Sequence, residues 1–233
     1  MKKALIILFL IFCGIQLQAQ SFDFSVLANG GLSHEVGKST VNSTFLNADA
    51  STHTGYANGD GNTLAFSYGA GFQFQYTFKC DFILGAQTVY EVVSIKTNIN
   101  GVYDGTGGGE ISASGYTTNH YGFININPYF GYRFKINKVR LDVLPGFDVS
   151  FGVANKQVVN VKASDNSYYN KPNIAIENGD DLRLRLGLAA YYKRYGITAS
   201  GSRGFDQFAR YADAYIPPEH MEIFRLGLLY KLK

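Results

Sequence analysis

The side chains best suited to acid–base or hydrolytic chemistry in this chain are its four histidines, because imidazole titrates near neutral pH. They are His34, His53, His120 and His220. None is followed by a serine two residues later, and no G-x-S-x-G nucleophile motif occurs. Each lies in or beside a segment that we expect to be a long loop. We interpret all four as solvated loop side chains, and we predict that the chain is not an enzyme and has no catalytic residues.

Two glycine-rich segments offer groups for a phosphate or a cation, but both lack residues that such sites need. The run 104–110 has no Gly-Lys-Ser/Thr ending, which a phosphate-binding loop requires. The run 58–62 offers oxygen ligands for calcium, yet it lacks regular acidic spacing and a closing glutamate. We predict a flexible loop tip at 104–110 and a turn at 58–62, with no metal and no cofactor.

Aromatic and basic side chains in the segment 203–220 form a candidate docking patch. Phe208, Arg210 and Tyr215 lie among apolar residues spaced three and four apart, which is the period of a helix face, and Pro217 would end such a helix. Tyrosine and arginine are enriched where protein interfaces concentrate binding energy. The alternative is that this aromatic face caps the barrel mouth or rests against lipopolysaccharide.

Five charged residues recur at alternate positions of extended segments, so that they share the polar face. These residues are Glu91, Asp148, Arg183, Arg185 and Arg225. Buried charges are costly unless they are paired. We therefore predict a lumen charge network in which Glu91 and Asp148 share hydrogen bonds with some of the three arginines and close the pore.

The elements that must position these side chains are strands, as residues 64–78 show most clearly. Their even-numbered positions are all apolar or aromatic, whereas their odd-numbered positions are small or polar. Successive side chains of a strand face opposite sides, so this period of two predicts a strand with one apolar face. Seven further segments share the sorting less purely: 22–32, 82–92, 124–136, 139–153, 182–192, 197–202 and 224–232.

The connections between these eight segments alternate in length. Short turns are expected at 79–81, at Asn137-Lys138 and at 194–196, and long segments at 33–63, 98–115, 155–180 and 203–220. Outer-membrane barrels have an even number of strands, short periplasmic turns and longer extracellular loops. The fold class predicted is therefore all-β, an eight-stranded antiparallel up-and-down transmembrane β-barrel in the cell outer membrane, with both termini periplasmic.

The N-terminus predicts export. Lys2 and Lys3 precede an apolar run at 4–15, and a polar stretch with small residues follows. This is the order of a secretory signal peptide, and the apolar run is short for a transmembrane helix. We expect cleavage after Ala19, which leaves a signal peptide (1–19) and an outer-membrane β-barrel domain (20–233). A lipoprotein signal at Cys13 is disfavoured by the bulky Phe12 before it.

The charge balance argues against a nucleic-acid partner. Of 21 basic residues, two leave with the signal peptide, so 19 remain against 18 acidic residues. A net charge of about +1 is far from the basic surplus that phosphate backbones select. Cys80 is the single cysteine after residue 19, so the mature domain has no internal disulfide.

A soluble barrel would also alternate, but two features favour lipid outside. The polar face carries opposite charges and many glycines, which suits the narrow lumen of eight strands, whereas a ligand-binding soluble barrel would line its lumen with apolar side chains. Aromatic residues also cluster toward strand ends, as at Phe66/Tyr68 and Tyr76/Phe78, where membrane interfaces belong.

The last residues carry a family resemblance. The run 225–232, RLGLLYKL, resembles the C-terminal assembly signal of outer-membrane barrels, with a polar residue, a glycine, an aromatic residue and a terminal hydrophobic one. With the strand pattern, the mature chain resembles the PorT-like outer-membrane β-barrel domain family. The resemblance implies a small eight-stranded barrel that the barrel-assembly machinery inserts.

These observations lead to one leading hypothesis and three alternatives. We expect a non-enzymatic integral outer-membrane protein with a surface-binding or envelope-structural role carried by its extracellular loops. Its expected partners are outer-membrane lipid and lipopolysaccharide, the barrel-assembly machinery and a surface or envelope protein. The alternatives are a secretion-associated barrel or narrow porin, a lipid-modifying enzyme, and a soluble periplasmic ligand-binding β-barrel.

Overall fold

The computed structural model describes residues 21–232, except for gaps at 39, 50, 53, 59–60, 104–108, 171–172, 175–178 and 206–218, and it leaves the side chains of residues 173–174 undescribed. The predicted signal peptide therefore lies outside the described residues. So does the candidate docking patch of Phe208, Arg210 and Tyr215.

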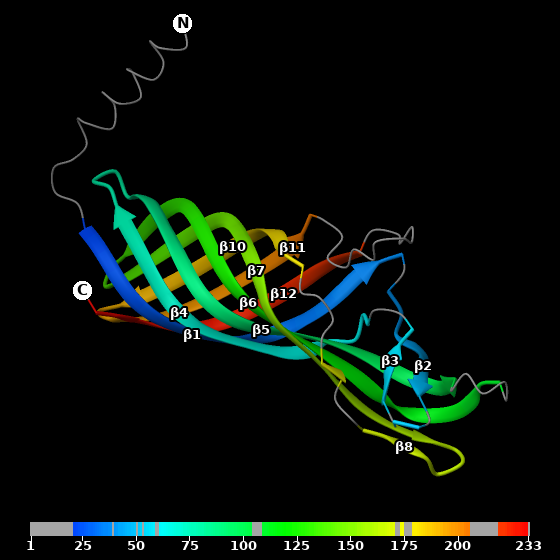
Figure 1. Cartoon of the computed structure of the whole chain (residues 1–233). Coiled ribbons are helices and arrows are strands. Elements are labelled where there is room, and N and C mark those ends of the chain that lie inside the picture. The colour runs from blue at the N-terminus through cyan, green and yellow to red at the C-terminus, as the bar shows by residue number, and fades with distance from the viewer. Residues whose placement is uncertain are drawn as a thin grey trace, which may run out of the picture.

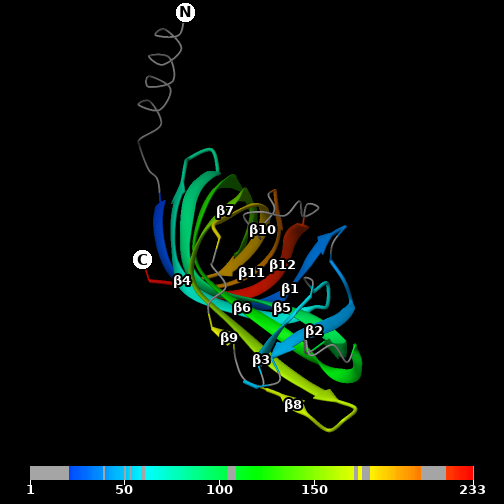
Figure 2. The same ribbon diagram turned by 45° about the vertical axis from the view of Figure 1, so that its right-hand side comes forward.

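Eight strands close into a barrel, as the sequence pattern predicts (Figures 1 and 2). They are β1 (Ser21–Gly37), β4 (Ala65–Thr77), β5 (Phe82–Tyr103), β6 (Ile111–Ile136), β7 (Val139–Ala163), β10 (Asp181–Tyr192), β11 (Tyr195–Gly204) and β12 (Glu219–Lys231). Each pairs antiparallel with the next one in the chain, β12 pairs with β1, and β5 pairs with both β4 and β6. The ring has no open edge, so its backbone groups are satisfied within the wall.

The side chains of the wall divide as the period of two predicts. On β4, Tyr68, Phe72 and Phe74 are exposed on the outside, whereas the intervening Gln73 and Gln75 are buried inside. The other wall strands also expose large apolar side chains between buried polar ones. An apolar outer surface around a polar interior is the arrangement of a transmembrane barrel.

Aromatic side chains gather near both ends of this outer surface. At the end with the short turns, Phe82 packs against Tyr132 with ring centroids 5.5 Å apart, and Tyr195 against Tyr230 at 5.4 Å. At the other end the neighbouring rings of Phe66 and Tyr68 are exposed. These positions match the two interfacial girdles of a membrane barrel.

The short turns and both described ends of the chain lie at one end of the barrel. Ser25 pairs with Lys231, and Ser21 pairs with Thr77 next to the first turn. The first two turns fall where they were predicted. The third falls at Lys193-Arg194 rather than at 194–196, because Lys193 adopts the left-handed conformation (φ 54°) that a tight turn needs and β11 then begins at Tyr195.

At the opposite end, β5, β6 and β7 continue far beyond the barrel, which corrects three of the predicted long loops. The last pair between β4 and β5 joins Tyr68 to Val92, whereas β5 and β6 stay paired as far as Val102 and Ile111. The expected loops 33–63, 98–115 and 155–180 therefore contain the ends of wall strands, and they also include β2 (Ser43–Asp49), β3 (Thr54–Ala57), β8 (Tyr168–Tyr169) and β9 (Asn173–Ile174).

We call this projecting sheet the extension; it consists of β2, β3, β8 and the parts of β5, β6 and β7 at 93–103, 111–122 and 154–163. Figure 1 shows it leading away from the barrel on the side opposite the termini. The hairpin of β2 and β3 joins this sheet at the edge of β5, where β2 pairs parallel with β5, and Leu46 is buried against Ile99, Val102, Val159 and Val161. The extension therefore has a hydrophobic core of its own.

The lumen is also filled with apolar side chains, which the sequence pattern did not indicate. Leu27, Val89, Leu144 and Leu229 form a buried cluster with aromatic residues that include Tyr129.

Of the described residues, none forms a helix long and apolar enough to cross a membrane.

Candidate functional site

Four of the five predicted network residues meet at one level of the lumen. The Arg225 guanidinium donates from Nη2 to Glu91 Oε2 at 2.7 Å and from Nε to the other carboxylate oxygen. The same Nη2 lies 3.2 Å from Asp148 Oδ2, and Arg185 Nη1 donates to Asp148 Oδ1 at 3.1 Å. All four side chains are buried, so these are ion pairs inside the barrel.

Arg183 joins the cluster through neighbours that sequence reasoning did not single out. Its Nη2 donates to Asn125 Oδ1 at 3.2 Å and to the Ser150 hydroxyl, and Asn125 in turn donates to Glu91 Oε2 at 2.6 Å. Its Nε lies 3.4 Å from Asp181 Oδ2. Asn125 and Ser150 share the inward parity of their strands, which is the signal that could have identified them.

A second charged layer lies nearer the turn end. Arg133 donates twice to Asp142, at 2.8 and 2.7 Å, and Gln75 donates to Asp142 Oδ2 at 3.0 Å. Asp23 lies 3.8 Å from Arg133 and also pairs with Lys231.

The charges of the lumen are balanced within each layer. The upper layer holds three arginines with Glu91, Asp148 and Asp181, and the lower layer holds Arg133 and Lys231 with two aspartates. Paired ions of this kind can remain buried, and eight strands enclose a space only just wide enough for side chains. Within these two layers, the packed interior therefore has no surplus of either charge.

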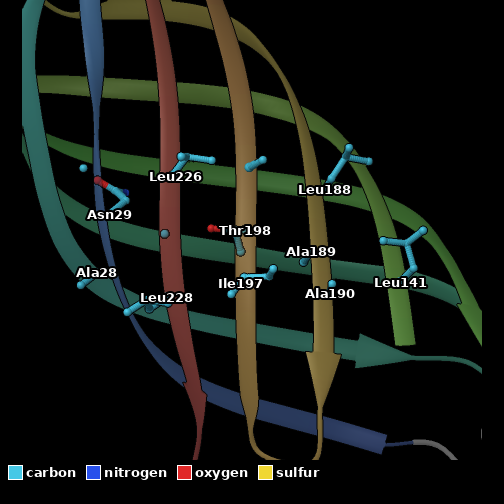
Figure 3. Close-up of a pocket in the computed structure, with 13 residues that line it drawn as sticks. Ala28, Asn29, Leu141, Leu188, Ala189, Ala190, Ile197, Thr198, Leu226 and Leu228 are labelled. Atoms are coloured by element: carbon cyan, nitrogen blue, oxygen red, sulfur yellow. The ribbon is translucent and has the colours of Figure 1, made fainter. Parts of the chain in front are cut away.

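The outer wall carries a shallow apolar groove of about 650 Å³ across β1, β12, β11 and β10 (Figure 3). Its lining combines the small side chains of Ala28, Ala190 and Ala199 with the larger ones of Leu226 and Leu188. Leu226 is 71% exposed, so this surface faces out from the barrel. An exposed surface made almost wholly of aliphatic carbon suits contact with lipid chains.

The geometry of the wall decides the class of protein. The chain is a β-barrel of the outer-membrane type. No protein-family model and no curated protein sequence matches it.

Solved structures with a similar course of the chain are also small outer-membrane barrels. Ail of Yersinia pestis, solved with the heparin analogue sucrose octasulfate, has 12% identity and a TM-score of 0.38, with 91% of this chain and 99% of Ail covered. Neisserial surface protein A has 8% identity and a TM-score of 0.39, with 92% and 100% covered. The outer membrane protease OmpT of Escherichia coli has 9% identity and a TM-score of 0.32, with 92% and 97% covered. Similarities this distant carry no information on what this chain binds.

The three histidines that the structure describes lie in strands and not in loops, which corrects the interpretation from sequence. His34, His120 and His220 belong to β1, β6 and β12, because these strands run past the membrane; His53 lies outside the described residues. His34 Nε2 lies 3.3 Å from Glu222 Oε2, and Arg203 Nη1 lies 3.2 Å from the other oxygen of that carboxylate, Oε1. His34 is therefore a partner in a contact at the barrel rim.

One histidine contact resembles a hydrolytic pair. Ser94 Oγ lies 2.9 Å from His120 Nδ1, but Ser94 is only 2% exposed, so a substrate carbonyl cannot reach its hydroxyl. His120 lies beyond the apolar belt, and burial together with the nearby Lys156 holds the pKa of its imidazole below the usual value. Among the described residues, no group of three or more histidine, cysteine or acidic side chains could hold a metal ion.

Proposed function

We propose that this chain is a non-enzymatic integral outer-membrane protein whose barrel serves as a rigid, sealed base for a binding surface outside the cell. The observation that carries the proposal is the extension. Three wall strands run on beyond the barrel and hold a separate hydrophobic core. A purely structural barrel needs no such addition, whereas a surface for recognition must stand clear of the membrane and keep its shape.

The proposed orientation places the extension outside the cell and both termini in the periplasm. It is supported by the three short turns at the end where the chain begins and ends, since periplasmic turns of these barrels are short. The partners that follow are lipopolysaccharide around the wall, the barrel-assembly machinery during insertion, and a surface or envelope protein at the extension.

The alternatives have less support. A narrow porin needs an open path, but the lumen holds two layers of paired ions and an apolar cluster. A lipid-modifying enzyme needs an accessible nucleophile, and the serine beside His120 is buried. A soluble periplasmic barrel would expose the apolar outer surface to water, at roughly 25 cal/mol for each Å². We also propose that the chain belongs to the PorT-like family, which the resemblance of the closing run supports. A secretion-associated role is therefore the second candidate.

Cys80 provides the test of orientation, because it is exposed in the first short turn. We would treat intact cells with a membrane-impermeant maleimide, and compare the parent chain with Cys80→Ser/Ser164→Cys, which moves the thiol to the exposed turn after β7. In intact cells we expect the label on the Ser164→Cys chain alone. Cys80 should be labelled only after the outer membrane is permeabilised. The reverse result would refute the orientation.

The binding role requires a second experiment. The tip of the β5–β6 hairpin would be shortened by replacing residues 98–115 with a two-residue turn, and surface proteins crosslinked to the parent and to the shortened chain would be compared. We expect the shortened chain to keep its different migration before and after boiling in detergent, which reports the folded barrel, and to lose a specific crosslinked partner. Equal crosslinking by both chains would remove the extension as the binding surface.

A further inference from the structure

The outer face of the extension carries a group of basic and aromatic side chains on three adjacent strands. We call it the basic face; it consists of Lys96, Tyr116, His120, Lys156 and Lys162. His120 pairs in register with Lys156, and Lys96 Nζ lies 4.3 Å from the centroid of the Tyr116 ring. The residues of opposite parity are buried in the core of the extension, so the basic face points outward.

The positive charge of the basic face is not neutralised by neighbouring side chains. In the described part of the chain, no carboxylate lies within 4.0 Å of the ammonium groups of Lys96, Lys156 or Lys162. Two surface cations elsewhere are paired, Arg203 with Glu222 at 3.2 Å and Lys135 with Asp81 at 2.6 Å. Three unpaired lysines on one sheet face attract an anion from outside the chain.

The basic face begins where the apolar belt ends. Val153 on β7 is 50% exposed, and Lys156 follows three residues later, which is about 10 Å along a strand. On β6, His120 lies four residues beyond the outward Ile124. Because strands of a barrel are tilted, the height above the belt is less than the distance along the strand. Lys156 therefore lies at the level of the lipid headgroups, and Lys96, which is level with Val158, follows shortly above it, whereas Lys162 lies about 20 Å farther along β7 than Lys156.

From this placement we infer that the membrane-proximal part of the basic face, made of Lys96, His120 and Lys156, binds the phosphate groups of the phosphorylated glycolipid in the outer leaflet. The inference rests on the proposed orientation of the barrel. Lysine ammonium groups bind phosphate oxygens as point charges, and long lysine side chains extend toward the interface over apolar surface. The apolar side chains directly below, Ile124 and Phe151, contact the acyl chains of the same lipid. One molecule is thus held at its phosphates and its chains, which fixes the extension relative to the membrane.

The test measures stabilisation of the mature full-length protein in detergent by added lipid A that carries its phosphates, with dephosphorylated lipid A as the second probe. The patch variant is Lys96→Gln/Lys156→Gln/Lys162→Gln. The matched control is Lys79→Gln/Lys138→Gln/Arg194→Gln, which removes the same charge from exposed positions at the turn end. The temperature at which the folded form is lost on gels is recorded for each protein with and without lipid.

We expect phosphorylated lipid A to raise that temperature for the parent and the control, and to bind the patch variant at least tenfold more weakly. Dephosphorylated lipid A and free inorganic phosphate should give little change, because each supplies only half of the contacts. Equal loss in the control variant, or an unchanged effect in the patch variant, would overturn the inference. If the patch variant does not fold, single substitutions of Lys156 and Lys96 with the same readout decide the matter. Labelling of Cys80 reports the orientation of the barrel separately. A wrong orientation is therefore distinguishable from a loss of lipid binding.

Discussion

The ion pairs of the upper lumen layer predict a large loss of stability when one carboxylate is neutralised without changing its shape. Asp148→Asn is the perturbation, because Asp148 is 0% exposed and lies 3.1 Å from Arg185 and 3.2 Å from Arg225. The substitution leaves three arginines in the layer with only Glu91 and Asp181. A net positive charge then remains buried.

The magnitude follows from the distances. Two unit charges about 3 Å apart attract by about 5 kcal/mol at an effective dielectric constant of about 20. Breaking a buried pair by removing one partner costs about 3–5 kcal/mol, because the remaining ion keeps its desolvation penalty. Asp148→Asn is therefore expected to lower the free energy of unfolding by about 3–5 kcal/mol. The paired replacement Glu91→Leu/Arg225→Met keeps the layer neutral and should cost less than either single replacement.

Unfolding would be followed in lipid vesicles by urea titration. The chain contains no tryptophan and 17 tyrosines, so tyrosine fluorescence and far-ultraviolet circular dichroism are the signals. The control is Asp81→Asn, which removes a pair at 2.6 Å whose Lys135 side chain is 60% exposed, and which should cost less than about 1 kcal/mol. If Asp148→Asn and Asp81→Asn cost the same, the lumen charges are screened by water and the packed interior inferred above is wrong.

Three further outcomes are expected. In planar bilayers the purified protein should show no steady conductance, and a stable ion current would contradict the sealed lumen. Gly85→Val should destabilise the barrel by about 1–3 kcal/mol, because a Cβ at Gly85 would lie 2.4 Å from the Tyr129 hydroxyl oxygen. Gly201→Ala should be tolerated, because its Cβ would meet only ordinary contacts at 3.7 Å. Equal costs would show that Tyr129 can move aside. By proton NMR, the pKa of the His120 imidazole should lie below the usual histidine value, because the side chain is partly buried and near Lys156. Protonation of His120 therefore disfavours the folded state as pH falls through the usual value. Lys156→Gln should raise the pKa of His120, and an unchanged pKa would remove Lys156 as a cause.

The sequence by itself determined the strands of the wall and the direction of their side chains. In a strand, the side-chain period of two is a local property, so residues 64–78 reveal both faces without knowledge of any partner. The same parity placed Glu91, Asp148 and the three arginines on the inner face. The period becomes hard to read beyond the membrane, where neither face has to contact lipid, and the continuation of β5, β6 and β7 into the extension was therefore missed.

Only the tertiary structure decided which inner residues meet. Glu91 and Arg225 are 134 residues apart, and their contact depends on closure of the ring and on the stagger of its strands. A bulge between Gly122 and Phe123 in the pairing of β6 with β7 shifts the register of β7 above the belt, and this shift turns Lys156 and Lys162 outward. Closure, stagger and bulges arise from contacts between distant strands, so the pattern within any one strand does not contain them.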